Sequence, residues 1–124
     1  MVGSMTLNLL GLRTVIYPSP DLDAAKTWWS EALGQAPNFD QPFYVGFSVG
    51  GYELGLLPDA SVADGPLVYW GVTDVQDAID NALAHGATAH EPAADVGDGI
   101  VTGTVTSPSG SVIGFIFNPH FAVG

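Results

Sequence analysis

The sequence of 124 residues contains no cysteine and only two basic residues, Arg13 and Lys26. The absence of cysteine excludes disulfide bonds and thiolate metal ligands. The 13 acidic residues outnumber the basic ones and give a formal net charge of -11. Nucleic acid is therefore disfavoured as a partner, because phosphate contacts require a basic surface. The acidity serves either the solubility of a chain that is 47% hydrophobic or the attraction of a cationic ligand.

Long apolar runs are also missing, and no stretch approaches the length that spans a bilayer. The first residues lack the basic start, apolar core and cleavage site of a signal peptide. We therefore expect a cytoplasmic protein with no membrane partner. Residues 1–10 are expected to form a flexible N-terminal segment, whose first four residues, ahead of Met5, are compatible with a tag remnant. Residues 11–124 are expected to form a single domain.

Two segments, residues 12–34 and 67–86, repeat one pattern of a strand followed by a helix. Each begins with an apolar run rich in Val, Ile, Tyr or Trp, which is typical of a strand. Asp21 or Asp74 then follows, and each can cap a helix whose apolar residues recur at helical spacing. A glycine ends each helix. The repeat indicates a duplicated structural unit.

Three further strands are predicted after each helix. In the first half, a short strand near residues 35–39 precedes a hairpin of 43–49 and 52–57, whose turn is Gly50-Gly51. In the second half we expect a short strand at residues 87–90 and a loop at 92–99. Two longer strands follow at 100–106 and 112–117. The predicted fold class is therefore α+β, with two tandem βαβββ modules at about residues 11–58 and 66–119.

The paired βαβββ order, the hairpin GGYELGLL and the ending SPSGSVIGFIFNPHF resemble the vicinal oxygen chelate superfamily. That superfamily includes glyoxalase I, ring-cleaving dioxygenases, fosfomycin resistance proteins and bleomycin-binding proteins. The resemblance covers nearly the whole chain after Leu10. It implies that the two modules form a curved mixed sheet shaped like a cup, and that the protein is a homodimer.

Enzymes of this superfamily hold a metal through His or Glu on the first strand of each module and Glu on the last. The matching positions here are Thr14, Leu67, Gly55 and Gly114, which together offer one hydroxyl group. A divalent cation needs several N or O donors that converge on one point. We therefore expect no metal and no other cofactor. The alternative is a non-standard metal site that uses histidine: His85, His90 or His120.

Alternation along the strands predicts which side chains face the interior of the cup. They are mostly apolar with a few polar groups, as in a small-molecule pocket. The glycines at the former ligand positions are expected to leave room for a flat ligand. Glu53 is the one carboxylate predicted inside, but the favoured interpretation of this residue is a solvated, edge-facing position in the hairpin. The predicted ligand-binding residues are Thr14, Ile16, Tyr44, Gly55, Leu57, Leu67, Tyr69, Gly114 and Ile116.

Two functions are compatible with this pattern. The first is a metal-free protein, similar to bleomycin resistance proteins, that binds a small cationic or aromatic organic molecule in an apolar cup. The alternative is a lyase, isomerase or hydrolase, metal-independent or with an atypical metal, that uses Glu53 as a general acid or base. The sequence leaves open whether the protein is an enzyme.

Overall fold

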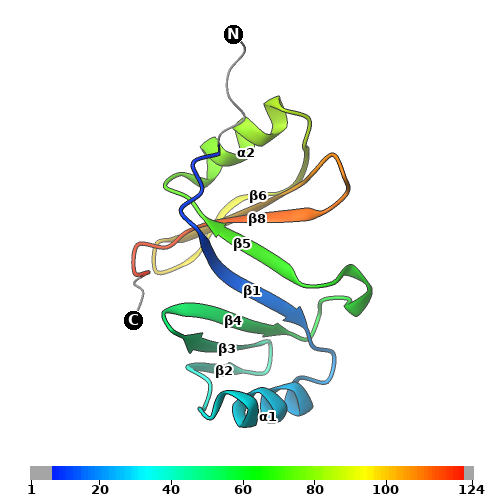
Figure 1. Cartoon of the computed structure of the whole chain (residues 1–124), viewed down its shortest axis with the longest axis vertical. Helices are drawn as coiled ribbons and strands as arrows, with labels where there is room; N and C mark the ends of the chain where they lie inside the picture. Colours follow the sequence, from blue (N-terminus) through cyan, green and yellow to red (C-terminus); the bar gives the residue numbers. More distant parts are fainter. Residues whose placement is uncertain (1–6, 122–124) are drawn as a thin grey trace. The chain divides into compact units, whose positions relative to one another are not determined.

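The computed structural model describes residues 7–121 (Figure 1). The tag remnant predicted at residues 1–4 lies outside the described residues. Within them the chain is α+β and follows the βαβββ order twice, as predicted. The chain divides into two compact units. We call residues 14–67 the first module and residues 7–13 with 68–121 the second module.

The first module is a four-stranded mixed sheet in the order β2-β3-β4-β1. β1 runs parallel to β4, and the other neighbours are antiparallel. α1 packs on β3 and β4 (Figure 1). The elements are β1 (Leu12–Pro18), α1 (Leu22–Leu33), β2 (Phe39–Gln41), β3 (Tyr44–Val49), β4 (Tyr52–Leu57) and the short 3-10 helix η1 (Val62–Asp64).

Both ends of α1 are as the sequence predicts. The Asp21 side chain accepts a hydrogen bond from the Ala24 amide, 3.1 Å away, and so satisfies one of the free N–H groups of the first turn. Gly34 ends the helix at φ 67°, in the left-handed region that favours glycine. The apolar face of α1 covers a small core of three buried residues: Val45, Phe47 and Leu56.

The second module repeats the plan in the order β5-β8-β7-β6. β5 is parallel to β8, and the β8-β7 and β7-β6 pairs are antiparallel. α2 packs on β6, β7 and β8 (Figure 1). Its core includes Val105 and Phe115, which the helix covers with four buried side chains. The elements are β5 (Leu67–Gly71), α2 (Val75–Ala84), β6 (Thr88–Gly97), β7 (Ile100–Thr106) and β8 (Val112–Phe117).

The loop predicted at residues 92–99 is wrong over most of its length. β6 continues to Gly97 and pairs with β7, although its register shifts three times along the way. β6 stands at the end of the strand order, and an edge strand with bulges tolerates Pro92 because its missing N–H breaks no central ladder. The turn itself is confined to residues 98–99, where Asp98 has a φ of 55°. Within residues 7–121, no helix is long and apolar enough to cross a membrane.

Candidate functional sites

The first module holds the Glu53 carboxylate between two hydroxyl groups. Thr14 Oγ1 donates to Glu53 Oε1 at 3.2 Å, and Tyr44 OH donates to Glu53 Oε2 at 3.0 Å. Thr14 is 5% exposed, whereas Glu53 is accessible to solvent. Each carboxylate oxygen therefore has its own donor, and the group is oriented while it stays within reach of a ligand.

Strand pairing explains how these three residues meet. The parallel β1-β4 pair places Thr14 opposite Glu53. Tyr44 comes from β3, and its ring reaches across the glycines on its own strand and on β4. A methyl group at Gly46 would lie 3.0 Å from Glu53 Oε2, and one at Gly55 would overlap the Tyr44 hydroxyl. Two glycines therefore make room for the cluster.

This arrangement corrects one expectation from the sequence. The space in front of Gly55 was expected to accept a flat ligand, but Tyr44 occupies it. The second module uses the same device. Tyr69 lies opposite Gly114 in the β5-β8 pair, and a methyl group at Gly114 would lie 2.5 Å from Tyr69 Cδ2. In both modules the glycine of the last strand is covered by a tyrosine of the protein itself.

Two exposed phenylalanines extend the Glu53 cluster toward the edge of the first-module sheet. The Phe39 ring centroid lies 6.1 Å from that of Tyr44 and 5.9 Å from that of Phe43. Phe39 is 45% exposed and Phe43 is 61% exposed. An accessible group of three aromatic rings thus adjoins an accessible carboxylate. The sequence contained both phenylalanines, but nothing in their spacing connected them with Glu53.

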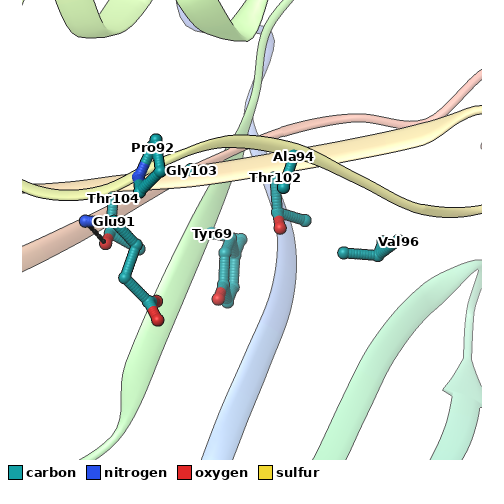
Figure 2. A pocket seen from close by; sticks show the side chains of 8 residues that line it. All are labelled: Tyr69, Glu91, Pro92, Ala94, Val96, Thr102, Gly103 and Thr104. Carbon is teal, nitrogen blue, oxygen red and sulfur yellow. Dashed lines mark hydrogen bonds between the residues drawn. The ribbon is translucent and has the colours of Figure 1, made fainter.

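The second module contains a cavity of about 260 Å³. Figure 2 shows the Tyr69 ring and the Glu91 carboxylate pointing to the same side of the strands that form its wall. The lining combines apolar side chains with hydroxyl groups, and Glu91 is the only charged residue among the described lining residues. These are Tyr69, Glu91, Pro92, Ala94, Val96, Thr102, Gly103 and Thr104.

Thr104 fixes one end of this cavity. Its hydroxyl accepts from the Glu91 amide at 3.0 Å and lies 2.7 Å from His90 Nδ1, and the residue is only 1% exposed. A threonine hydroxyl has one proton and two acceptor lone pairs, so Oγ1 can accept from the Glu91 amide and also form a hydrogen bond with His90 Nδ1, whose tautomer sets the direction. The hydroxyl therefore ties β7 to β6 at the point where the β6 register shifts between Ala89 and Glu91.

Sequence reasoning missed the cavity residues on β6 because it assigned most of them to a loop. One signal was available, since Thr102, Thr104 and Thr106 alternate along a strand and mark one polar face. Tyr69 is the one predicted ligand residue that lines the cavity.

The remaining predicted residues are distributed over the two modules. Thr14, Tyr44 and Gly55 gather around Glu53, and Gly114 lies beneath Tyr69. Ile16 is opposite Gly55 in the β1-β4 pair, and Leu57 is opposite Pro18. Ile116 is 7% exposed and pairs with Gly71, while Leu67 is half-buried at the start of β5. None of these last four residues lines the described cavity.

The donor set does not fit the divalent cation that the superfamily resemblance implies. Thr14 donates its hydroxyl proton to Glu53. The other three positions that match the family's metal ligands are Gly55, Leu67 and Gly114, and none has a side-chain oxygen or nitrogen. No three His, Asp or Glu side chains within residues 7–121 are grouped to hold a metal. The histidines contact other groups: His85 Nδ1 lies 2.9 Å from Asn81 O, His90 contacts Thr104, and His120 Nε2 lies 2.9 Å from Asp98 O.

Comparison with known proteins relates the chain to solved structures alone. It matches no protein-family model and no curated protein sequence. It is similar to a methylmalonyl-CoA epimerase from Streptomyces coelicolor, with a TM-score of 0.72 and 14% identity over 90% of this chain and 99% of that one. It is also similar to a glyoxalase/bleomycin resistance protein/dioxygenase superfamily member from Vibrio splendidus 12B01, with a TM-score of 0.62 and 16% identity over 86% and 99%.

A third similar structure is that of an NAD-dependent benzaldehyde dehydrogenase from Legionella pneumophila, with a TM-score of 0.64 and 15% identity over 84% of this chain and 96% of that one. The chain therefore has the vicinal oxygen chelate fold, and the resemblance predicted from the sequence is confirmed at the level of the fold. These proteins are named for different activities. At such identities the shared fold transfers none of those activities to this chain.

Proposed function

We propose that the protein binds a small organic molecule, cationic or aromatic, and that it does so without a metal. The observation that carries this proposal is the second-module cavity, in which apolar walls surround a few polar groups. Its volume of about 260 Å³ lies just below the range of about 300–1,000 Å³ for ligand pockets, which favours a small ligand. Tyr69 offers an aromatic surface on which such a molecule can stack.

Charge supports a cationic ligand. Glu91 is the charged residue of the cavity lining, and the whole chain carries a formal charge of -11. The similar epimerase structure contains 2-nitronate-propionyl-CoA. A CoA derivative carries phosphates, which would need basic partners. Here Lys26 is paired with Asp40 at 3.1 Å, and Arg13 lies 3.8 Å over the Phe121 ring. The chain is therefore poorly equipped for a CoA ligand.

Calorimetric titration with small aromatic amines and their uncharged analogues tests this function. We expect the amines to bind with the same affinity before and after treatment with a chelator. Glu91→Gln should weaken binding at least about tenfold, because a hydrogen bond to a charged group contributes about 1.5–3 kcal/mol and a tenfold step corresponds to about 1.4 kcal/mol. Glu31→Gln, an equal change of charge on exposed α1, should leave it unchanged. Absence of binding across the panel, or binding that requires an added transition metal, would contradict the proposal.

The Glu53 cluster supports a second candidate function, metal-independent acid–base catalysis. Two hydroxyl donors orient the carboxylate, as a positioned general base requires. The test is solvent deuterium exchange into carbon acids, in the presence of a chelator, by the native protein and by Glu53→Gln. Exchange that is lost in Glu53→Gln and kept in Glu31→Gln supports catalysis. Exchange restored only by Ni²⁺, Fe²⁺ or Mn²⁺ would count against it.

We also propose that the protein is a cytoplasmic homodimer. The support is the superfamily resemblance, whose small members commonly pair across a two-fold axis. Multi-angle light scattering at several concentrations tests the assembly, and a mass of one chain at all of them would refute it.

A further inference from the structure

We infer that the first module carries a separate site for a small alkylammonium cation, formed by Phe39, Phe43, Tyr44 and Glu53. We call these four residues the aromatic–carboxylate cluster. The inference goes beyond the proposed binding function, because the cluster shares no residue with the second-module cavity, although it shares Glu53 with the second candidate function. Its ligand class follows from three properties of the cluster: its rings, its charge and its accessibility.

The rings come from the β2-β3 hairpin. Phe39 lies in β2, Tyr44 begins β3, and Phe43 occupies the turn between them. Successive ring centroids are 5.9 and 6.1 Å apart, and the rings are inclined to each other by 70° and 57°. Inclined rings present both faces and edges to a neighbour. A cation can therefore approach the electron-rich face of one ring while it stays close to the others.

The carboxylate lies at the inner end of these rings. Glu53 Oε2 accepts from Tyr44 OH at 3.0 Å. Both Glu53 Oε2 and Phe39 Cβ lie close to the point that a methyl group at Gly46 would occupy, at 3.0 and 3.7 Å respectively. The absence of a side chain at Gly46 therefore brings the negative charge next to the aromatic rings.

No basic side chain in the described part of the chain pairs with this carboxylate. Lys26 donates to Asp40, whose position on β2 alternates with Phe39 and so faces the opposite side of the sheet. Arg13 stacks on the Phe121 ring. Within residues 7–121, Glu53 has hydrogen-bond donors and no cationic partner. A charged and accessible group beside exposed rings is thus left for an external cation.

An alkylammonium ion suits this cluster better than a metal ion does. A metal ion would require several oxygen or nitrogen ligands, and the cluster offers one carboxylate. An alkylammonium ion binds through its charge and its apolar methyl groups, which is the chemistry that aromatic cages recognise.

Choline provides the test, with 3,3-dimethyl-1-butanol as a probe of the same shape that lacks the charge. Calorimetry gives the affinity, and amide shifts in ¹H–¹⁵N NMR spectra locate the site. We expect choline to bind with shifts confined to residues 39–46 and 53, and the neutral probe to bind at least tenfold more weakly. Glu53→Gln should weaken choline binding about tenfold and Phe43→Leu about threefold, as is usual for one exposed cation–π contact.

Matched controls come from α1. Glu31→Gln removes the same charge, and Trp28→Leu removes an aromatic side chain that is 61% exposed, like Phe43. Both should leave choline binding unchanged. Equal binding of the two probes, or no choline binding, would overturn the inference. So would a dimer that dissociates in Phe43→Leu without any choline binding, because a second copy would then cover the rings. Choline binding weakened by Glu91→Gln instead of Glu53→Gln would leave the proposed function standing and reject this site.

Discussion

The two helices arise from one repeated sequence pattern, yet they pack differently. α2 buries Val75, Ala78, Ile79 and Ala82, whereas no residue of α1 is fully buried. The sheet beneath each helix explains the difference. A methyl group at Gly103 would lie 2.7 Å from Ile79 Cδ1, so a bare backbone at this position lets α2 approach β7 closely.

The first module has no counterpart of that close approach. The apolar face of α1 includes bulky residues such as Trp29, which stacks on Tyr17 with 5.6 Å between ring centroids. The glycines of its sheet, Gly46 and Gly55, make room for Tyr44 and Glu53 instead of for the helix. The two duplicated modules thus use glycine for partly different purposes. Both modules use the glycine of the last strand to make room for a tyrosine. The second module uses a further glycine, Gly103, for packing against its helix, whereas Gly46 in the first makes room for an accessible polar and aromatic cluster.

The largest effect that tests this comparison is the loss of a core phenylalanine. Phe115 is 0% exposed and belongs to a buried cluster of seven described residues, whereas Phe47 is 1% exposed in a cluster of three. Truncation to alanine costs about 3–5 kcal/mol of unfolding free energy. We expect Phe115→Ala at the upper end of this range and Phe47→Ala at the lower end, measured by urea denaturation. Phe117→Ala, at 36% exposed, is the control. A larger loss in Phe47→Ala would reverse the comparison.

Local features of the fold could be predicted because each depends on neighbours in the sequence. Asp21 and Asp74 cap their helices as expected, with acceptor distances of 3.1 and 3.0 Å to the capped amides. The Gly50-Gly51 turn joins β3 and β4, and Gly50 has a φ of 59°. Such turn and cap residues act through their own backbone, so one sequence is sufficient to recognise them.

The candidate sites depend on contacts between distant residues, and these were only partly predictable. Strand alternation placed Thr14, Glu53 and Gly55 on one face, and the structure brings Thr14 and Glu53 together. Alternation could not show that Tyr44 would fill the space in front of Gly55, because rotamers depend on neighbouring strands. β6 was missed because Pro92 and the register shifts conceal its period of two.

A smaller effect should follow from adding one methyl group to a glycine of each sheet. In Gly103→Ala the new Cβ meets Ile79 Cδ1 at 2.7 Å and the Ala93 backbone at 3.3 Å. Overpacking of this kind costs about 1–3 kcal/mol. In Gly46→Ala the new Cβ meets the far ends of Glu53 and Tyr44, which can move away, so we expect a loss below about 1 kcal/mol. Urea denaturation measures the unfolding free energy of both variants. Equal losses would contradict the proposed difference between the two glycines.

Thr104→Val tests the hydroxyl that connects β6 to β7. Valine keeps the shape of the side chain but cannot accept from the Glu91 amide or contact His90 through a hydrogen bond. We expect a loss of about 1–2 kcal/mol, because the amide then lacks its protein partner. Thr102→Val is the matched control on the same strand and face. Faster hydrogen exchange at the Glu91 amide should accompany the loss. Unchanged exchange there would show that solvent or another group satisfies this amide.

The smallest loss of stability is expected when the equivalent helix caps, Asp21 and Asp74, are removed. These substitutions act on the helices and leave the sheets unchanged. Asp74→Ala and Asp21→Ala each remove one acceptor from the first turn, which costs about 1 kcal/mol in either helix. The two helices should respond differently in native-state hydrogen exchange, since tertiary packing supports α2 more than α1. Asp21→Ala should accelerate exchange along much of α1, while Asp74→Ala should affect only the first turn of α2. Hydrogen exchange that accelerates along the whole of both helices would mean that burial of the four α2 side chains adds no local stability. The two modules would then differ in geometry and not in the stability of their helices.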